Sequence, residues 1–207
     1  NQQVFSEKLN ELQLDFENLS ESNCPKISFL KLEIDQVPET YKNSLNDYFT
    51  DLGLNKNNLF TDVSNYLSYE TGQPTHCYDA STMSGKLLFH EIDKNEEFET
   101  LLDKKITLSG KNSVFSLNDN IINLAGIVGG KSTSCSTNTK TVIVECAFFQ
   151  PEAIIGKSVK YDIQSEASHK FERGVDPDCH DRVLRRFIKL VSEHVNIKDM
   201  SIISYKS

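Results

Sequence analysis

The chain has 207 residues, of which 38% are hydrophobic and 25% charged, and its formal net charge is −8. These values are typical of a soluble globular protein with a sizeable core, and no apolar run approaches the length of a membrane span. The start lacks a secretion signal and no Lys/Arg run is present, which excludes a protein that grips nucleic acid mainly through its phosphates.

Apolar residues recur at helical spacing at the start of the chain, which predicts an amphipathic helix over residues 3–19. Because this helix opens the sequence without an initiator methionine, we expect the chain to be a fragment of a longer polypeptide. KISFLKLEI at residues 26–34 predicts a strand. A second helix is predicted to begin at Pro38 and end at Gly53, and a weaker one covers residues 58–70.

Residues 86–147 show a different pattern of short strand-like runs separated by Gly, Asn and Ser turns. A helix is predicted near residues 151–158. The next helix is predicted to have Asp176 as its N-cap and Pro177 at its first position, and MSIISY closes the chain as a strand. Since the strands do not alternate with long helices, we predict an α+β fold. Its core is a largely antiparallel, barrel- or sandwich-like β structure flanked by helices.

The sequence indicates how the chain is divided into domains. No internal repeat or low-complexity linker is present, so we assign residues 24–207 to one domain and residues 1–23 to a separate N-terminal helix.

The five cysteines form no CxxC motif: Cys24, Cys77, Cys135, Cys146 and Cys179. An odd number of unpaired thiols predicts a reducing, cytoplasmic setting.

The stretch LAGIVGGKS, residues 124–132, has the glycines, lysine and serine of a phosphate-binding loop. Such a loop requires a glycine five positions before Gly130, where this chain has Ala125. The following TSCSTNTKT is a poor helix former, so the helix whose N-terminus would bind phosphate is missing. We therefore predict a strand end and a glycine turn. A second interpretation is that the glycines let a substrate approach bare backbone.

The segment GQPTHCYD places His76 and Cys77 after a turn that contains Pro74. Neighbours in an extended chain point in different directions, which argues against a Cys–His catalytic pair. Paired metal ligands at a recognisable spacing are also missing, so we predict no metal site. Two interpretations remain: a polar loop histidine, or part of a binding loop shaped by the proline.

The segment VIVECAFF places Glu145 inside an apolar strand, on the face that alternation gives to Ile143 and Ala147. A carboxylate among such neighbours is costly unless it is paired. Glu145 is either an edge-strand residue that reaches solvent or an acceptor or base in a cleft.

The segment SEASHKFERGVDP, residues 165–177, carries three cationic or potentially cationic residues, His169, Lys170 and Arg173. They could contact phosphate, but the pattern favours the solvated end of a helix.

Four motifs, ETGQPTHCYDA, LAGIVGG, VIVECAFFQPEAI and SEASHKFERGVDP, occur in an order and at a spacing that resemble one family. They resemble the editing region, the third and fourth domains, of the bacterial phenylalanyl-tRNA synthetase β subunit, over roughly residues 24–195. The resemblance implies hydrolysis of mischarged Tyr-tRNA(Phe) within the ATP-dependent enzyme that ligates phenylalanine to tRNA(Phe). It implies as partners the tRNA 3′ end, the α subunit and the remaining β-subunit domains, in an assembly of two α and two β subunits. It implies neither a cofactor in this domain nor a membrane partner.

The resemblance also implies roles for individual residues. Glu145 would recognise the tyrosine hydroxyl, and His76 would lie in the same pocket beside Pro74. Gly126 and Gly129 would supply backbone at the pocket wall.

Two further site residues follow from the family's TDAS segment, which is SEAS here. Ala167 matches the family and would bind substrate, whereas Ser165 replaces a threonine. We assign His76 and Ser165 to catalysis, with His76 orienting water or the terminal ribose. Many members carry an arginine where this chain has Asn55.

Three classes of function remain open. Intact His76, Glu145 and Ala167 favour an aminoacyl-tRNA ester hydrolase. Asn55 favours a non-catalytic module, with a degenerate editing site, that positions tRNA within the synthetase. The third, a freestanding protein with another ligand, is disfavoured by the order of the motifs.

Overall fold

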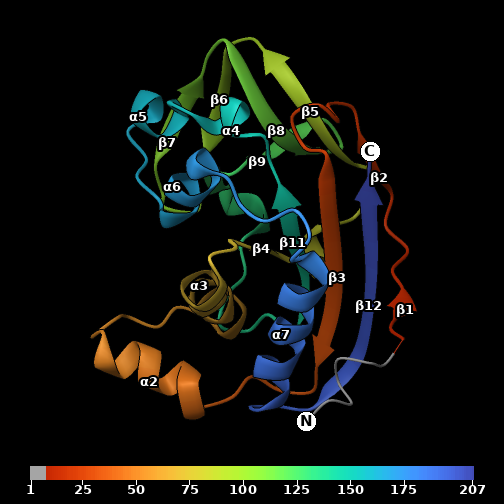
Figure 1. The fold of residues 1–207 in the computed structure, drawn as a ribbon, viewed down its shortest axis with the longest axis vertical. Coiled ribbons are helices and arrows are strands. Elements are labelled where there is room, and N and C mark those ends of the chain that lie inside the picture. The colour runs from red at the N-terminus through yellow and green to blue at the C-terminus, as the bar shows by residue number, and fades with distance from the viewer. Residues whose placement is uncertain (1–7) are drawn as a thin grey trace.

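The computed structural model of the chain describes residues 8–207 as two five-stranded sheets and a small hairpin, flanked by helices (Figure 1). The first sheet has the strand order β1 (Asn10–Glu11), β12 (Ile197–Lys206), β3 (Lys26–Ile34), β11 (Thr141–Phe148) and β4 (His76–Asp79). The second has the order β10 (Val128–Gly129), β9 (Asn120–Leu124), β8 (Lys111–Leu117), β5 (Leu87–Asp93) and β2 (Phe16–Asn18). The hairpin pairs β6 (Glu96–Glu99) with β7 (Lys105–Leu108).

Strand pairing is antiparallel throughout these sheets except where β1 joins β12 and β2 joins β5. The predicted α+β class with a largely antiparallel core is confirmed. The strands of the described part form open sheets and do not close into a barrel.

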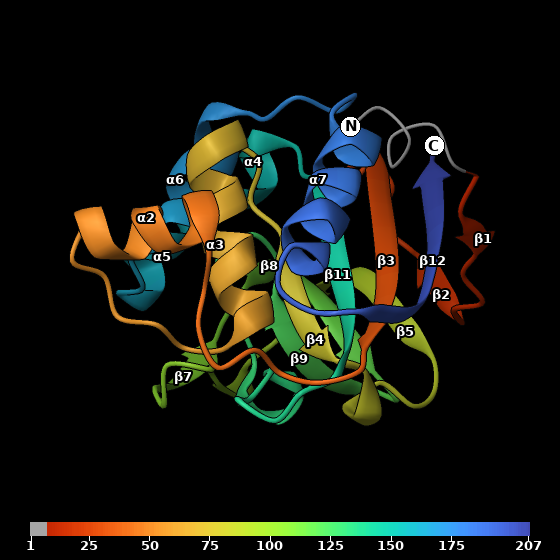
Figure 2. The ribbon, with the colours of Figure 1, turned by 90° about the horizontal axis from the view of Figure 1, so that it is seen from below.

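Six helices are described: α2 (Asn43–Asp51), α3 (Leu59–Thr71), α4 (Pro151–Ile154), α5 (Lys157–Tyr161), α6 (Glu166–Arg173) and α7 (His180–Ser192). Short 3-10 turns cover residues Ala80–Thr82 and Lys131–Thr133. Helices α3 and α7 pack on each other, and α7 packs on β3 and β11 (Figure 2). Within residues 8–207, no helix is long and apolar enough to cross a membrane.

The alternation predicted along β11 divides its side chains between two cores. Val144 and Cys146 belong to the core beneath α3 and α7. Ile143 and Ala147 face the core shared by the two large sheets. Glu145 has the same parity as this second pair, so the backbone directs its carboxylate into the space between the sheets.

The helix predicted over residues 3–19 is wrong for residues 8–19, which contain β1 and β2 and no helical residue. Residues 1–7 lie outside the described part of the chain. Phe16 packs its ring 5.0 Å from that of Phe29 and 4.9 Å from that of Tyr205. Pairing with the edges of both sheets and this aromatic burial outweigh the helical spacing of the apolar residues.

Three other helix boundaries differ from prediction. The helix predicted to begin at Pro38 begins later, because α2 starts at Asn43 and residues 38–42 are not helical. Asp176 does not cap a helix: its side chain accepts a hydrogen bond from the Asp178 amide at 2.8 Å, and α7 begins later, at His180. The helix predicted near residues 151–158 is divided into α4 and α5 by Gly156, whose φ of 78° is left-handed. Such a conformation ends a helix and suits glycine.

Candidate functional site

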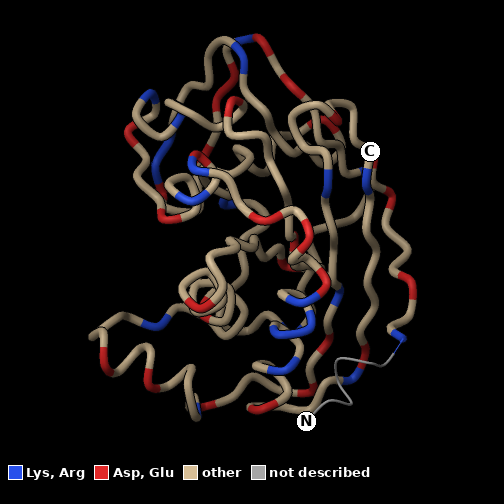
Figure 3. Tube along the Cα trace, in the orientation of Figure 1, with Lys and Arg blue, Asp and Glu red and all other residues tan. Residues whose placement is uncertain are grey.

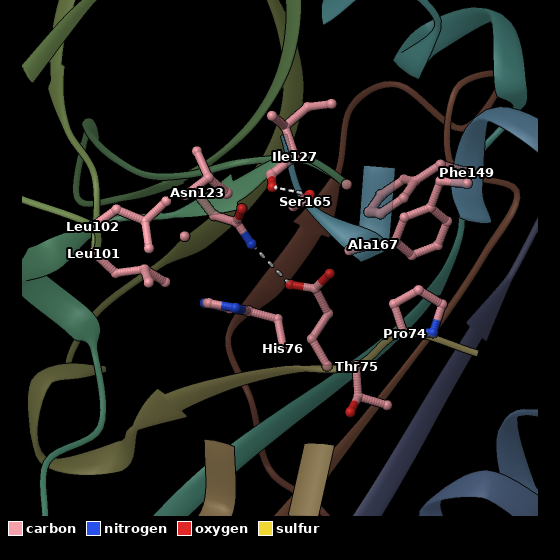
Figure 4. Close-up of a pocket in the computed structure, with 15 residues that line it drawn as sticks. Pro74, Thr75, His76, Leu101, Leu102, Asn123, Ile127, Phe149, Ser165 and Ala167 are labelled. Carbon is pink, nitrogen blue, oxygen red and sulfur yellow. Dashed lines mark hydrogen bonds between the residues drawn. The ribbon is translucent and has the colours of Figure 1, made fainter. Parts of the chain in front are cut away.

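A cavity of about 190 Å³ lies where β4, β11, the β9–β10 turn, the tip of the β6–β7 hairpin and the start of α6 meet (Figure 4). All seven predicted site residues line it: Pro74, His76, Gly126, Gly129, Glu145, Ser165 and Ala167. The sequence reasoning did not select eight other lining residues: Thr75, Leu101, Leu102, Asn123, Ile127, Val128, Phe149 and Phe171. A cavity of about 150 Å³ in another protein holds one benzene ring, so this one has room for a single aromatic side chain.

The register of two neighbouring strands brings the two central polar residues together. Glu145 on β11 is directly opposite His76 on β4. Residues opposite each other in an antiparallel pair project from the same face of the sheet, so both side chains reach the cavity. Because β11 lies between β3 and β4, the interpretation of Glu145 as an edge-strand residue reaching solvent is wrong.

Glu145 is 4% exposed, and both hydrogen bonds to its side chain reach the same oxygen. The Tyr78 hydroxyl donates to Oε2 at 2.5 Å, and the Asn123 amide donates to it at 3.4 Å. Burial raises the pKa of Glu145 from 4.5 to about 7, against the lowering effect of these two hydrogen bonds. The carboxyl group therefore titrates near neutrality.

His76 presents a neutral imidazole to the same cavity. Burial lowers its pKa from 6.5 to about 4. Its ring meets the edge of the Tyr78 ring, with centroids 4.4 Å apart and an interplanar angle of 81°. Its Nε2 atom is buried and has no hydrogen-bond partner among the described residues. A buried polar atom of this kind calls for a ligand or water to complete its hydrogen bonding.

Gly126 and Gly129 form part of the cavity wall, and a side chain at either position would overlap neighbouring atoms. A Cβ atom at Gly129 would lie 2.2 Å from Cε1 of His76. Gly126 has a φ of 71°, and its Cβ would lie 2.8 Å from Cδ1 of Ile154. The glycine stretch is followed by a 3-10 turn at Lys131–Thr133. It therefore has no α-helix whose N-terminus could bind phosphate. The prediction of a strand end and glycine turn is confirmed.

Replacing Gly129 by alanine is expected to reduce the free energy of unfolding by about 1–3 kcal/mol, because the new methyl group overlaps the His76 ring. Urea unfolding measures the change. In a His76→Ala background the same substitution should cost much less, since the overlapping ring is gone. An equal cost in both backgrounds would contradict this account of the glycine.

Ser165 and Ala167 reach the cavity from the start of α6. The Ser165 hydroxyl donates to the Ile127 carbonyl at 2.9 Å and accepts from the Ser168 amide at 3.1 Å. It therefore caps α6 and ties the helix to the glycine wall. Its catalytic role stays a prediction.

The cationic residues of α6 fit a solvated helix end. His169 and Arg173 are exposed. The Lys170 ammonium donates to the carbonyl and the hydroxyl of Ser68, at 2.6 and 2.8 Å. Lys170 thus joins α6 to α3.

Two further hollows adjoin the cavity, and each shares Thr75 with it. One contains Asn55, Tyr48 and Asn65, and it shares Thr75 and Ser165 with the cavity. The other is lined by further polar residues, among them Asn57, Asn58, Thr61 and Ser134. Amide and hydroxyl groups of this kind suit a polar, extended substrate group that continues from an aromatic head in the cavity.

Comparison with known proteins identifies the family. The model of the B3/4 domain matches residues 29–196, and the chain belongs to that family. It is 32% identical over 170 residues to the phenylalanine–tRNA ligase β subunit of Psychrobacter arcticus, covering 82% of this chain and 21% of that protein. It is 38% identical over 132 residues to the corresponding subunit of Methylococcus capsulatus, covering 64% of this chain and 17% of that protein. The chain thus spans about a fifth of the length of these relatives.

A solved structure shows the same fold. An N-terminal fragment of the phenylalanyl-tRNA synthetase β subunit from Pyrococcus horikoshii matches with a TM-score of 0.56 and 10% identity. The match covers 94% of this chain and 52% of that fragment. The resemblance noted in the sequence is confirmed.

Proposed function

We propose that this chain is an editing domain that hydrolyses Tyr-tRNA(Phe), within the ATP-dependent synthetase that joins phenylalanine to tRNA(Phe). The observation that carries the proposal is the buried carboxylate of Glu145 at the wall of a cavity that fits one aromatic ring. Within residues 8–207, Oε1 of Glu145 has no hydrogen-bond partner and is not sealed from solvent, so it is available to a ligand hydroxyl.

The selectivity follows from the single hydroxyl by which tyrosine differs from phenylalanine. A mainly apolar synthetic pocket rejects an added hydroxyl only weakly, by roughly a hundredfold in comparable cases. In the cavity described here, tyrosine would place its hydroxyl on Glu145, whereas phenylalanine would cover Oε1 and leave it unpaired. An unsatisfied buried group costs about 1–3 kcal/mol, and more when it is charged, so the site prefers the ester that the synthetic site makes in error.

The hydrolysis itself needs an oriented water molecule, because an aminoacyl ester is already activated. His76 offers a neutral imidazole at the cavity wall, and the ring nitrogen that carries no proton can accept one from water or from a ribose hydroxyl of the substrate. The two hollows that share Thr75 with the cavity would receive the terminal nucleotide.

The charge distribution fits a domain that contacts only the tRNA 3′ end. Lys and Arg are interspersed with Asp and Glu along the chain (Figure 3), and the net charge is −8. We propose that the α subunit and the remaining β-subunit domains hold the tRNA body, in an assembly of two α and two β subunits in the cytoplasm. If other domains hold the tRNA body, this domain does not need a basic surface to bind it.

A second candidate function is a non-catalytic module that positions tRNA within the synthetase. Two observations favour it. Asn55 supplies no cation in the hollow where the family resemblance implies an arginine. The Ser165 hydroxyl is also engaged within the protein, since it donates to Ile127 and accepts from Ser168.

The two candidates are separated by deacylation of Tyr-tRNA(Phe) with the full synthetase that contains this chain, comparing wild type with Glu145→Ala. We expect the variant to lose about ten- to a hundredfold in rate, the value of a hydrogen bond to a charged group. Phe-tRNA(Phe) is the control ester, and Glu97→Ala, on the exposed β6–β7 hairpin, is the control variant. A wild-type enzyme that leaves Tyr-tRNA(Phe) intact would establish the non-catalytic module.

A further inference from the structure

At the wall of the cavity and behind it, three buried polar side chains from three strands form a continuous hydrogen-bonded chain. Asn123 on β9 donates to the Tyr78 hydroxyl at 2.8 Å, and Tyr78 on β4 donates to Glu145 on β11 at 2.5 Å. Tyr78 is fully buried and Asn123 is 3% exposed. Tyr78 does not line the cavity, so a ligand there would not touch it.

The direction of the hydrogen bonds in this chain is fixed by chemistry. The Asn123 amide nitrogen can only donate, so the Tyr78 hydroxyl accepts from it and is left to donate its own proton to the carboxylate. Both donors reach Oε2 of Glu145. Oε1 receives no hydrogen bond from the described residues. The two carboxylate oxygens are therefore unequal: one is held by the protein and one is open to the cavity.

We propose that Tyr78 and Asn123 are positioning residues that hold Oε2 of Glu145, so that Oε1 alone is aimed at the hydroxyl of the bound aromatic substrate. This inference rests on the proposed function of the site and names two residues that determine its specificity. Together, Tyr78 and Asn123 form a clamp that fixes the rotation of the Glu145 carboxylate before substrate binds. This reduces the ordering required on binding. The clamp also gives Oε2 its hydrogen-bond partners when no substrate occupies the cavity.

The clamp has a signature in the titration of Glu145. Its two hydrogen bonds lower the pKa of Glu145 against the effect of burial. The other titratable groups around the carboxylate are His76 and the thiols of Cys24, Cys77 and Cys146. Burial lowers the pKa of the imidazole and raises that of each thiol, so these groups are uncharged near neutrality.

The first test measures the Glu145 side-chain carboxyl by ¹³C NMR in the 207-residue chain as the pH is changed. Tyr78→Phe removes one oxygen, and it should raise the pKa of Glu145 above the wild-type value. Asn123→Ala should raise it less, since its bond to Oε2 is longer. The matched control is Tyr66→Phe, which removes another Tyr–Glu hydrogen bond, to Glu70 on α3, away from the cavity. An unchanged titration of Glu145 in both Tyr78→Phe and Asn123→Ala would overturn the clamp.

The second test measures hydrolysis by the full synthetase carrying the same substitutions. Tyr78→Phe should lower kcat/KM for Tyr-tRNA(Phe) by about tenfold, the worth of one positioned hydrogen bond, and should shift the pH profile upward with the pKa of Glu145. Tyr66→Phe should leave both unchanged. Equal kcat/KM and an unshifted profile in Tyr78→Phe would overturn the positioning role. A wild-type enzyme without hydrolytic activity would refute the proposed function alone, because the NMR titration still decides the clamp.

Discussion

Replacing His76 by alanine is expected to slow the hydrolysis of Tyr-tRNA(Phe) by about a hundredfold, the lower range of what a positioned acid or base contributes. The reason lies in the state of the ring. Its low pKa of about 4 keeps the imidazole neutral, and its buried Nε2 has no partner among residues 8–207. The ring nitrogen that carries no proton can therefore accept one from water or from the ribose at physiological pH. The loss should appear in kcat, because recognition of the hydroxyl belongs to Glu145.

The measurement is single-turnover deacylation by the full synthetase, with tyrosine binding followed separately by calorimetry. His90→Ala is the matched control: His90 is also a partly buried strand histidine with a lowered pKa, but its Nε2 contacts Ser116 on β8. We expect its rate to equal that of the wild type. Unchanged turnover in His76→Ala would remove His76 from the reaction, and a parallel loss of tyrosine binding would make it a binding residue instead.

Much of this architecture could be predicted from local sequence because its signals are local. The period-2 alternation of VIVECAFF assigns Glu145 to one face of β11, and the structure places it there. β3 occupies the nine residues of the predicted strand, Lys26–Ile34. The missing helix after Gly130 was likewise readable from a run of residues that disfavour helices.

The remaining features depend on contacts between distant parts of the chain. The apolar residues near the start do recur at helical spacing. However, this segment pairs with strands more than sixty residues away in the sequence and so forms β1 and β2. Asn123 lies outside the four motifs, and Tyr78 lies within ETGQPTHCYDA without any local sign of its role, because their meeting with Glu145 depends on how β9 lies against β4 and β11. One local signal did exist: Tyr78 follows His76 by two positions and therefore shares its face of the strand.

Replacing Glu145 by glutamine is expected to stabilise the chain progressively, relative to the wild type, as the pH rises from 4 to 8. Burial gives the folded state a higher carboxyl pKa, about 7, than the usual 4.5. Between these values the folded chain binds more protons than the unfolded chain, so wild-type stability falls as pH rises through this window. A shift of this size corresponds to about 3 kcal/mol. Glutamine has no charge to bury, and its carbonyl can still accept the hydrogen bond from Tyr78.

Urea unfolding of both proteins at several pH values isolates this effect. His76 and His180, whose pKa values are each lowered to about 4, act in the opposite direction: they remove stability as the pH falls below about 6.5. The wild-type curve alone therefore mixes opposing contributions. Both histidines are present in the variant as well, so the difference between the two proteins reports Glu145. A difference that does not change with pH would show that Glu145 titrates as an ordinary carboxylate, and the cavity would then lack the desolvated acceptor on which its selectivity depends.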